Sequence, residues 1–108
     1  MVEEMDDKKM FELLFMELVY SFQNMAMIAM GKLVNPATNK AEKNLMQAKA
    51  TIDMLRMLKE KTQGNLNENE TKLIEQVVLN LQLNYADEVE KDQPKADQPP
   101  AEKKEEKP

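Results

Sequence analysis

The chain has 108 residues and a formal net charge of −5 at neutral pH. A chain of this length holds one domain at most, and its acidic balance lacks the positive surface that phosphate binding needs, so nucleic acid is not expected as a partner. The sequence contains no cysteine and no histidine, which excludes disulfides and thiolate chemistry and removes the commonest metal ligand.

Glycine is rare, and most of the prolines lie near the C-terminus. Few turn residues and long runs with helical period predict an all-α protein: a three-helix bundle with antiparallel helices and short loops, which oligomerises. We expect the bundle in residues 1–87, with helices at about 8–30, 40–63 and 68–86. Residues 88–108 are charged and rich in proline, and they predict a disordered tail because they offer too little apolar surface to offset chain entropy.

Residues 10–30 predict the first helix, with sixteen apolar residues among twenty-one. Spacings of four and three residues place six of them on one a/d stripe: Phe11, Phe15, Leu18, Phe22, Met25 and Ala29. Other apolar residues cover much of the opposite side, so a single neighbouring surface cannot bury this helix. We therefore expect a second copy or a partner to cover part of it.

Two membrane alternatives remain for this helix. Its length suffices to span a bilayer, but Glu12 and Glu17 interrupt the apolar run, and acidic residues within a span are costly. A helix lying on a membrane surface usually carries lysine and arginine on its polar face, whereas here the polar positions hold glutamates and amides. Burial within an assembly is the preferred interpretation.

The second predicted helix is apolar on two sides, which makes it the middle element of the bundle. One face holds Leu45, Ala48, Ile52 and Leu55, and another, about 140° away, holds Met46, Ala50, Met54 and Met57. Charged residues between the faces form a seam toward water: Lys49, Asp53, Arg56 and Glu60. Our candidate interface residues from both helices are Phe11, Phe15, Leu18, Phe22, Met25, Met54 and Met57.

Boundary signals separate the helices. Gly31 and Gly64 are expected to end the first two helices in the left-handed conformation. The Asn35-Pro36 pair predicts a turn. Capping boxes are expected at the starts of helices two and three, in Asn39 with Glu42 and Asn67 with Glu70.

The third predicted segment fits two templates. Ile74, Val77, Val78, Leu81 and Tyr85 form a helical stripe, but residues 79–85 also alternate at strand period. We favour a helix because the capping signal leads directly into it and no partner strand exists in the chain. A strand here would have to pair between molecules.

Several residues resemble an uncharacterised bacterial family catalogued as domain of unknown function 1844. They include Ile52, Asp53, Leu55, Lys61, Thr62, Gly64, Asn65 and Leu66, and the resemblance runs over about residues 11–85. It implies a short, cytoplasmic, helical bacterial protein and no particular activity. The chain departs from the family pattern in its many methionines and in neutral amides at residues 80–84, where basic residues would be expected.

No arrangement of residues predicts catalysis. Ser21 is the only serine and has no histidine to activate it, and Glu12 and Glu17 project in different directions from one helix. Residues 62–66 could bind a small anion or the backbone of a partner, but a helix stop explains them more simply. We expect no enzyme activity, no cofactor and no metal.

The sequence therefore predicts a protein-interaction module in the cytoplasm that self-associates or binds a partner through helical faces rich in Met, Phe and Leu. An alternative is a carrier that holds an apolar ligand or acyl chain in a Met- and Phe-lined interior. A further alternative is a membrane-associated helical protein. The sequence indicates neither the partner nor the cellular process.

Overall fold

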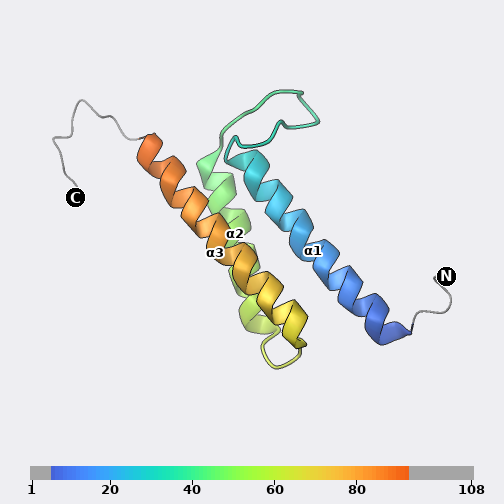
Figure 1. Cartoon of the computed structure of the whole chain (residues 1–108). Helices are drawn as coiled ribbons and strands as arrows, with labels where there is room; N and C mark the ends of the chain where they lie inside the picture. The colour runs from blue at the N-terminus through green and yellow to red at the C-terminus, as the bar shows by residue number, and fades with distance from the viewer. Residues whose placement is uncertain (1–5, 93–108) are drawn as a thin grey trace.

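The structure is a computed structural model that describes residues 6–92, and three α-helices pack together in it as a bundle (Figure 1). The helices are α1 (Asp7–Ala29), α2 (Leu45–Lys61) and α3 (Glu68–Lys91). Helix α2 runs antiparallel to both α1 and α3, and each helix packs on the other two. The predicted three-helix bundle is confirmed.

One face of each helix supplies the core. The buried side chains recur at spacings of three, four and seven residues, as one side of a helix requires. They are Val19, Ala26, Ala29 and Met30 from α1 and its end, Ala48, Ile52 and Leu55 from α2, and Ile74, Val77, Val78 and Leu81 from α3. The first predicted face of helix two is thus the core face, because its central residues are buried here.

Most of the predicted helix stops and starts are present. Gly31 has φ +80°, and the backbone N–H of Lys32 donates to the carbonyl of Met27 at 2.9 Å, which closes the end of α1. Gly64 has φ +90° in the turn after α2. At the start of α3, Asn67 and Glu70 form both hydrogen bonds of a capping box, each at 2.8 Å.

Helix α2 begins at Leu45, later than the predicted start near residue 40. The expected capping box of Asn39 and Glu42 is wrong, because Asn39 has φ +61° and its N–H donates to the carbonyl of Asn35 inside a tight turn. Asn44 caps the helix in its place: its side chain accepts the backbone N–H of Gln47 at 3.1 Å.

Helix α3 continues to Lys91, beyond the predicted end at residue 86. The predicted tail boundary at residue 88 is therefore wrong by a few residues, since Glu88 is helical and buried. Residues 79–85 lie inside this helix, which settles the choice between helix and strand. The rest of the predicted tail, residues 93–108, lies outside the described residues, as do residues 1–5.

Candidate functional site

A row of mostly apolar side chains on α1 is largely exposed in the described part of the chain. Phe11 is 59% exposed, and Leu14, Leu18 and Met25 are also exposed large hydrophobic residues. Ser21 and Ile28 continue the same spacing of three and four residues, which keeps all six positions on one side of the helix. We call this set the outer row: Phe11, Leu14, Leu18, Ser21, Met25 and Ile28.

The predicted stripe on the first helix is divided by the packing. Phe15 and Phe22 are half-buried and pack against the core, whereas Leu18 and Met25 point to solvent. The stripe is divided because the buried face of α1 is centred on Val19, which is fully buried. This buried face includes the edge of the stripe with Phe15 and Phe22 and leaves the other edge exposed. Sequence spacing alone places both halves on one face and cannot locate this edge.

Helix α2 also presents an uncovered apolar face. Met46 is 83% exposed, and Met54 and Met57 are each close to half exposed. The two faces predicted for this helix are therefore different in kind. The face of Ile52 and Leu55 is packed in the core, and the methionine face is largely exposed to solvent in the described residues.

The outer row and Met54 of α2 lie on the same side of the bundle. A hollow of about 290 Å³ at the end of α1 is lined by Met25 of α1 and by Gln47 of α2, among other residues. Met54 follows Gln47 by seven residues, and Leu18 precedes Met25 by seven, so each keeps to the side of its helix that borders the hollow. Because α1 and α2 are antiparallel, both rows run away from the hollow together. We call the outer row with Met54 and Met57 the apolar face.

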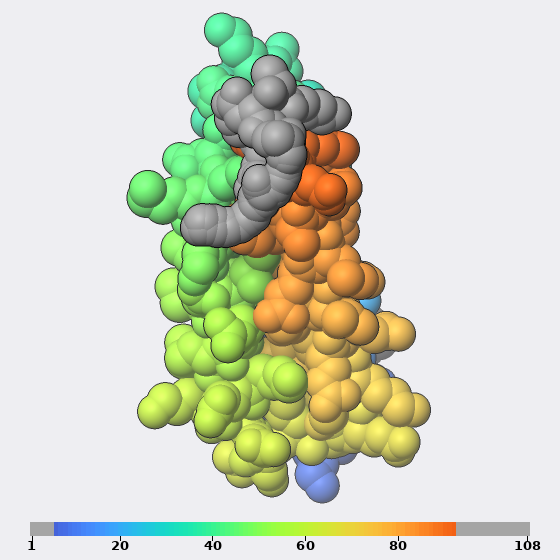
Figure 2. All heavy atoms as spheres, turned by 90° about the vertical axis from the view of Figure 1, so that its left-hand side faces the viewer, coloured from blue at the N-terminus to red at the C-terminus, as the bar shows by residue number. Residues whose placement is uncertain are grey.

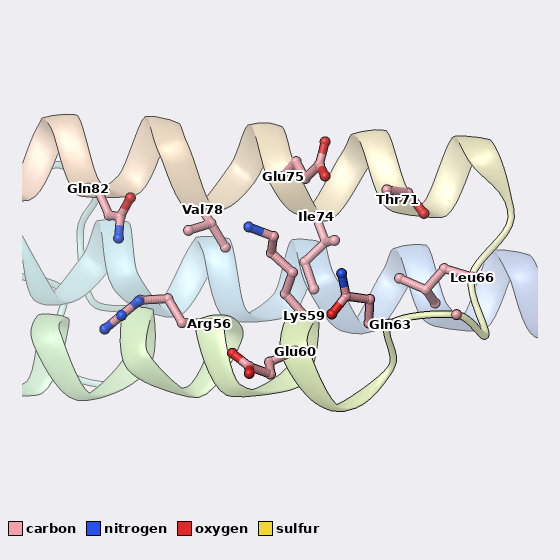
Figure 3. A pocket seen from close by; sticks show the side chains of 11 residues that line it. Arg56, Lys59, Glu60, Gln63, Leu66, Thr71, Ile74, Glu75, Val78 and Gln82 are labelled. Atoms are coloured by element: carbon pink, nitrogen blue, oxygen red, sulfur yellow. The ribbon is translucent and has the colours of Figure 1, made fainter.

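A second hollow, a groove of about 420 Å³, lies between α2 and α3 (Figure 3). Figure 2 shows these two helices side by side along the face where α1 is mostly hidden. Ile74, Val78 and Leu66 contribute the apolar lining, and Lys59 reaches from α2 toward α3 in Figure 3. Its charged rim residues are of both signs: Arg56, Lys59, Glu60 and Glu75. Because the lining mixes apolar, positive and negative groups, it does not indicate which kind of ligand the groove would bind.

A cluster of charges joins the C-terminal end of α3 to the loop between α1 and α2. Glu88 is only 5% exposed, and its carboxylate oxygens lie 2.7 Å from Nζ of Lys43 and 2.9 Å from Nζ of Lys32. Lys43 also lies 2.9 Å from Oδ1 of Asp92. Hydrogen bonds from Lys43, and to a lesser degree from Lys32, lower the pKa of Glu88 to about 2. The hydrogen bonds that Lys43 donates to Glu88, and to a lesser degree to Asp92, raise the pKa of Lys43. The cluster anchors the loop to α3.

The sequence reasoning missed this cluster because it assigned Glu88 to the tail. A signal was nevertheless present, since Ile74, Leu81 and Glu88 are spaced by seven residues and continue one helical face. A carboxylate on a core-facing position needs a buried counter-charge, and a lysine in the loop is the natural source. Only the folded loop, however, brings Lys32 and Lys43 to that position.

The charged seam on α2 is confined to its own helix. Asp53 accepts hydrogen bonds from Nζ of Lys49 at 2.8 Å and from Nη1 of Arg56 at 3.0 Å. These two hydrogen bonds lower the pKa of Asp53, and the one from Lys49 has the larger effect. These side chains are largely exposed, so water and salt screen the pairs and they stabilise α2 only weakly.

The other residues of the family motif build the core and the helix stop. Ile52 and Leu55 are buried. The Thr62 hydroxyl donates to the carbonyl of Leu58 at 2.8 Å, and Leu66 packs against the core. The remaining members lie in or beside the exposed turn: Lys61, Gly64 and Asn65. The structure thus gives the turn at residues 62–66 a structural role.

These features define a small helical bundle that exposes an apolar face on α1 and α2. The chain belongs to the family described as domain of unknown function (DUF1844), whose profile matches residues 12–87. No curated protein and no solved structure matches the chain. Within residues 6–92, no helix meets the length and apolarity of a membrane span, and no group of three or more acidic, histidine or cysteine residues is placed to hold a metal ion.

Proposed function

We propose that this protein is an interaction module that binds another protein chain through the apolar face. The observation that supports the proposal most directly is the exposure of large hydrophobic side chains along one side of α1, with Phe11 at 59% and Leu18 at 43%. Contiguous apolar surface of several hundred Å² on a soluble domain commonly marks a binding site.

The chemistry of this face suits binding. Its side chains are aryl, alkyl and thioether groups, with a single hydroxyl from Ser21 that already donates to the carbonyl of Glu17 at 2.9 Å. None of these groups moves a proton near neutral pH, but each contributes on the order of 1 kcal/mol when its exposed half is buried. Methionines also adapt their shape to a partner because their side chains are unbranched and flexible.

The alternative of a carrier for an apolar ligand receives less support. Val19, Leu55 and Ile74 are fully buried against the three helices, so the centre of the bundle is filled by side chains. The two hollows described above open at the surface. A binding face explains the exposed residues without requiring the helices to separate.

Photo-crosslinking in cells tests the proposal. A photoreactive phenylalanine analogue in place of Leu18 should give a crosslinked product, and the same analogue in place of Leu83 on α3 should not. Leu83 is a matched control because it is 62% exposed and belongs to another helix. Adding Met25→Glu should remove the product from the Leu18 position. Equal crosslinking from both positions, or none from either, would refute a specific binding role for the face.

A further inference from the structure

We infer that a second copy of this chain covers the apolar face, with the two α1 helices antiparallel and Phe11 of each copy seated in the 290 Å³ hollow of the other. This inference rests on the proposed function and names its partner. Three features of the described residues support it: the spacing of the outer row, the position of the exposed Phe11 and of the hollow at its two ends, and the absence of charge along it.

The outer row has the spacing of a coiled-coil seam. Its six positions, 11, 14, 18, 21, 25 and 28, alternate spacings of three and four residues, which is the a/d pattern that packs one helix against another. The core of the bundle uses a different side of α1, centred on Val19 and Ala26. The seam is therefore available to a second helix without any rearrangement of the fold.

An antiparallel pair matches residues at opposite ends of this seam. In such a pair an a position of one helix meets a d position of the other. Aligning the two rows about their midpoint puts Leu14 beside Met25 of the second copy and Leu18 beside Ser21. The same alignment brings Phe11 to Ile28, which lines the hollow.

Phe11 and the hollow lie at opposite ends of the outer row. Phe11 projects near the start of α1 with most of its surface exposed. The hollow lies at the end of α1, where Met25, Ile28 and Ala29 form its apolar wall. Polar side chains form the rest of its lining: Asn35, Glu42, Asn44 and Gln47. A two-fold axis through the middle of the row brings each Phe11 to the hollow of the other copy, so both contacts form at once.

The charges beside the seam are compatible with this arrangement. Each copy has a net charge of −5, so two copies repel each other across most of their surface. The outer row itself carries no charge. In the antiparallel alignment, Glu17 lies beside Asn24 of the second copy, whose amide is able to donate a hydrogen bond to it.

The length of the row is sufficient for a weak but specific dimer. A specific interface needs at least about 600 Å² from each copy. The row extends for about 26 Å along the helix axis, and Met54 and Met57 widen the contact on the α2 side. We therefore expect weak association, in the micromolar range, because interfaces at the lower end of the size range are often weak and transient.

Sedimentation of the purified full-length protein measures the association. Between about 1 and 200 μM, the average mass should rise from 12.5 kDa for the monomer toward twice that value. Phe11→Ala should weaken the dimer at least tenfold, as expected for an aromatic anchor, whereas Leu83→Ala on α3 should leave it unchanged. Both residues are exposed in the single chain, so both variants should fold, and circular dichroism checks this. A wild-type protein that stays monomeric throughout would overturn the inference.

Single cysteines test the orientation, because the chain has none of its own. A mixture of Leu18→Cys and Ser21→Cys proteins should form the mixed disulfide faster than either variant forms a disulfide with itself. Fastest pairing of Leu18→Cys with itself would indicate parallel helices and overturn the proposed arrangement.

The outcomes separate this inference from the proposed function. A monomeric protein whose Leu18 position still crosslinks to a different protein in cells would refute the second copy and leave the binding role in place. A dimer unaffected by Phe11→Ala, together with no crosslinking from Leu18, would refute both.

Discussion

Replacing Leu55 and Met54 by alanine, one at a time, tests which face of α2 supports the fold. The two residues are adjacent in sequence and similar in size. Leu55 is 0% exposed and lies in the core, whereas Met54 is 48% exposed on the apolar face. The structure therefore assigns nearly all the stabilising effect to Leu55.

The expected magnitudes follow from burial. Leu55→Ala removes three buried carbons, worth about 2.4 kcal/mol of transfer free energy at about 0.8 kcal/mol each. The cavity left behind brings the loss in free energy of unfolding to about 3–4 kcal/mol. The whole domain is expected to be stable by roughly 4–13 kcal/mol, so the loss is large. Met54→Ala should cost less than about 1 kcal/mol, because half of its side chain is already in water and alanine favours the helix.

Urea denaturation followed by circular dichroism measures both values. Both substitutions should be made in the Phe11→Ala protein, so that self-association does not add to the apparent stability. Equal losses for the two variants in this monomeric background would mean that the methionine face is packed within the single chain. That result would refute the assignment of the core and remove the basis for the apolar face.

Three further outcomes are expected. Lys43 and Lys32 hold the pKa of Glu88 at about 2, below its ordinary 4.5. This carboxylate therefore stabilises the fold above pH 4.5 and loses that effect as the pH falls toward 2. Glu88→Gln should lower the urea midpoint at pH 6 and make the midpoint decline less steeply between about pH 5 and 2. Asn67→Ala should lower the free energy of unfolding by about 1 kcal/mol, because the first turn of α3 loses its cap; an unchanged urea midpoint would contradict this role. Gly64→Ala should cost about 1 kcal/mol from its φ of +90° alone, since an added Cβ meets nothing within 4 Å; a much larger loss would show a steric contact that the structure lacks.

Local chemistry in the sequence accounts for most of the fold. Gly31 and Gly64 mark the two helix ends because both positions require a left-handed backbone, and Asn67 with Glu70 marks the start of α3 because their side chains satisfy each other's backbone N–H groups. The start of α2 was harder to predict. Asn39 and Asn44 both have capping side chains, and only the turn around Asn35 decides which of them precedes the helix.

The candidate interface was predicted as a set of residues but not as a surface. Phe11, Leu18 and Met25 are exposed, whereas Phe15 and Phe22 pack against the core, although all five share one stripe in the sequence. The charged cluster at Glu88 was not predicted, because Glu88 was assigned to the tail and its lysines are distant in the sequence.

The sequence by itself determined the number of helices, the stops of the first two helices and the surplus of apolar residues on α1 and α2. These properties depend on the preferences of neighbouring residues along the chain, which operate before any tertiary contact forms. Only the tertiary structure decided which side of each helix is covered. Burial of one apolar face against another depends on how the helices are rotated about their axes, and that rotation is fixed by the packing of all three helices together.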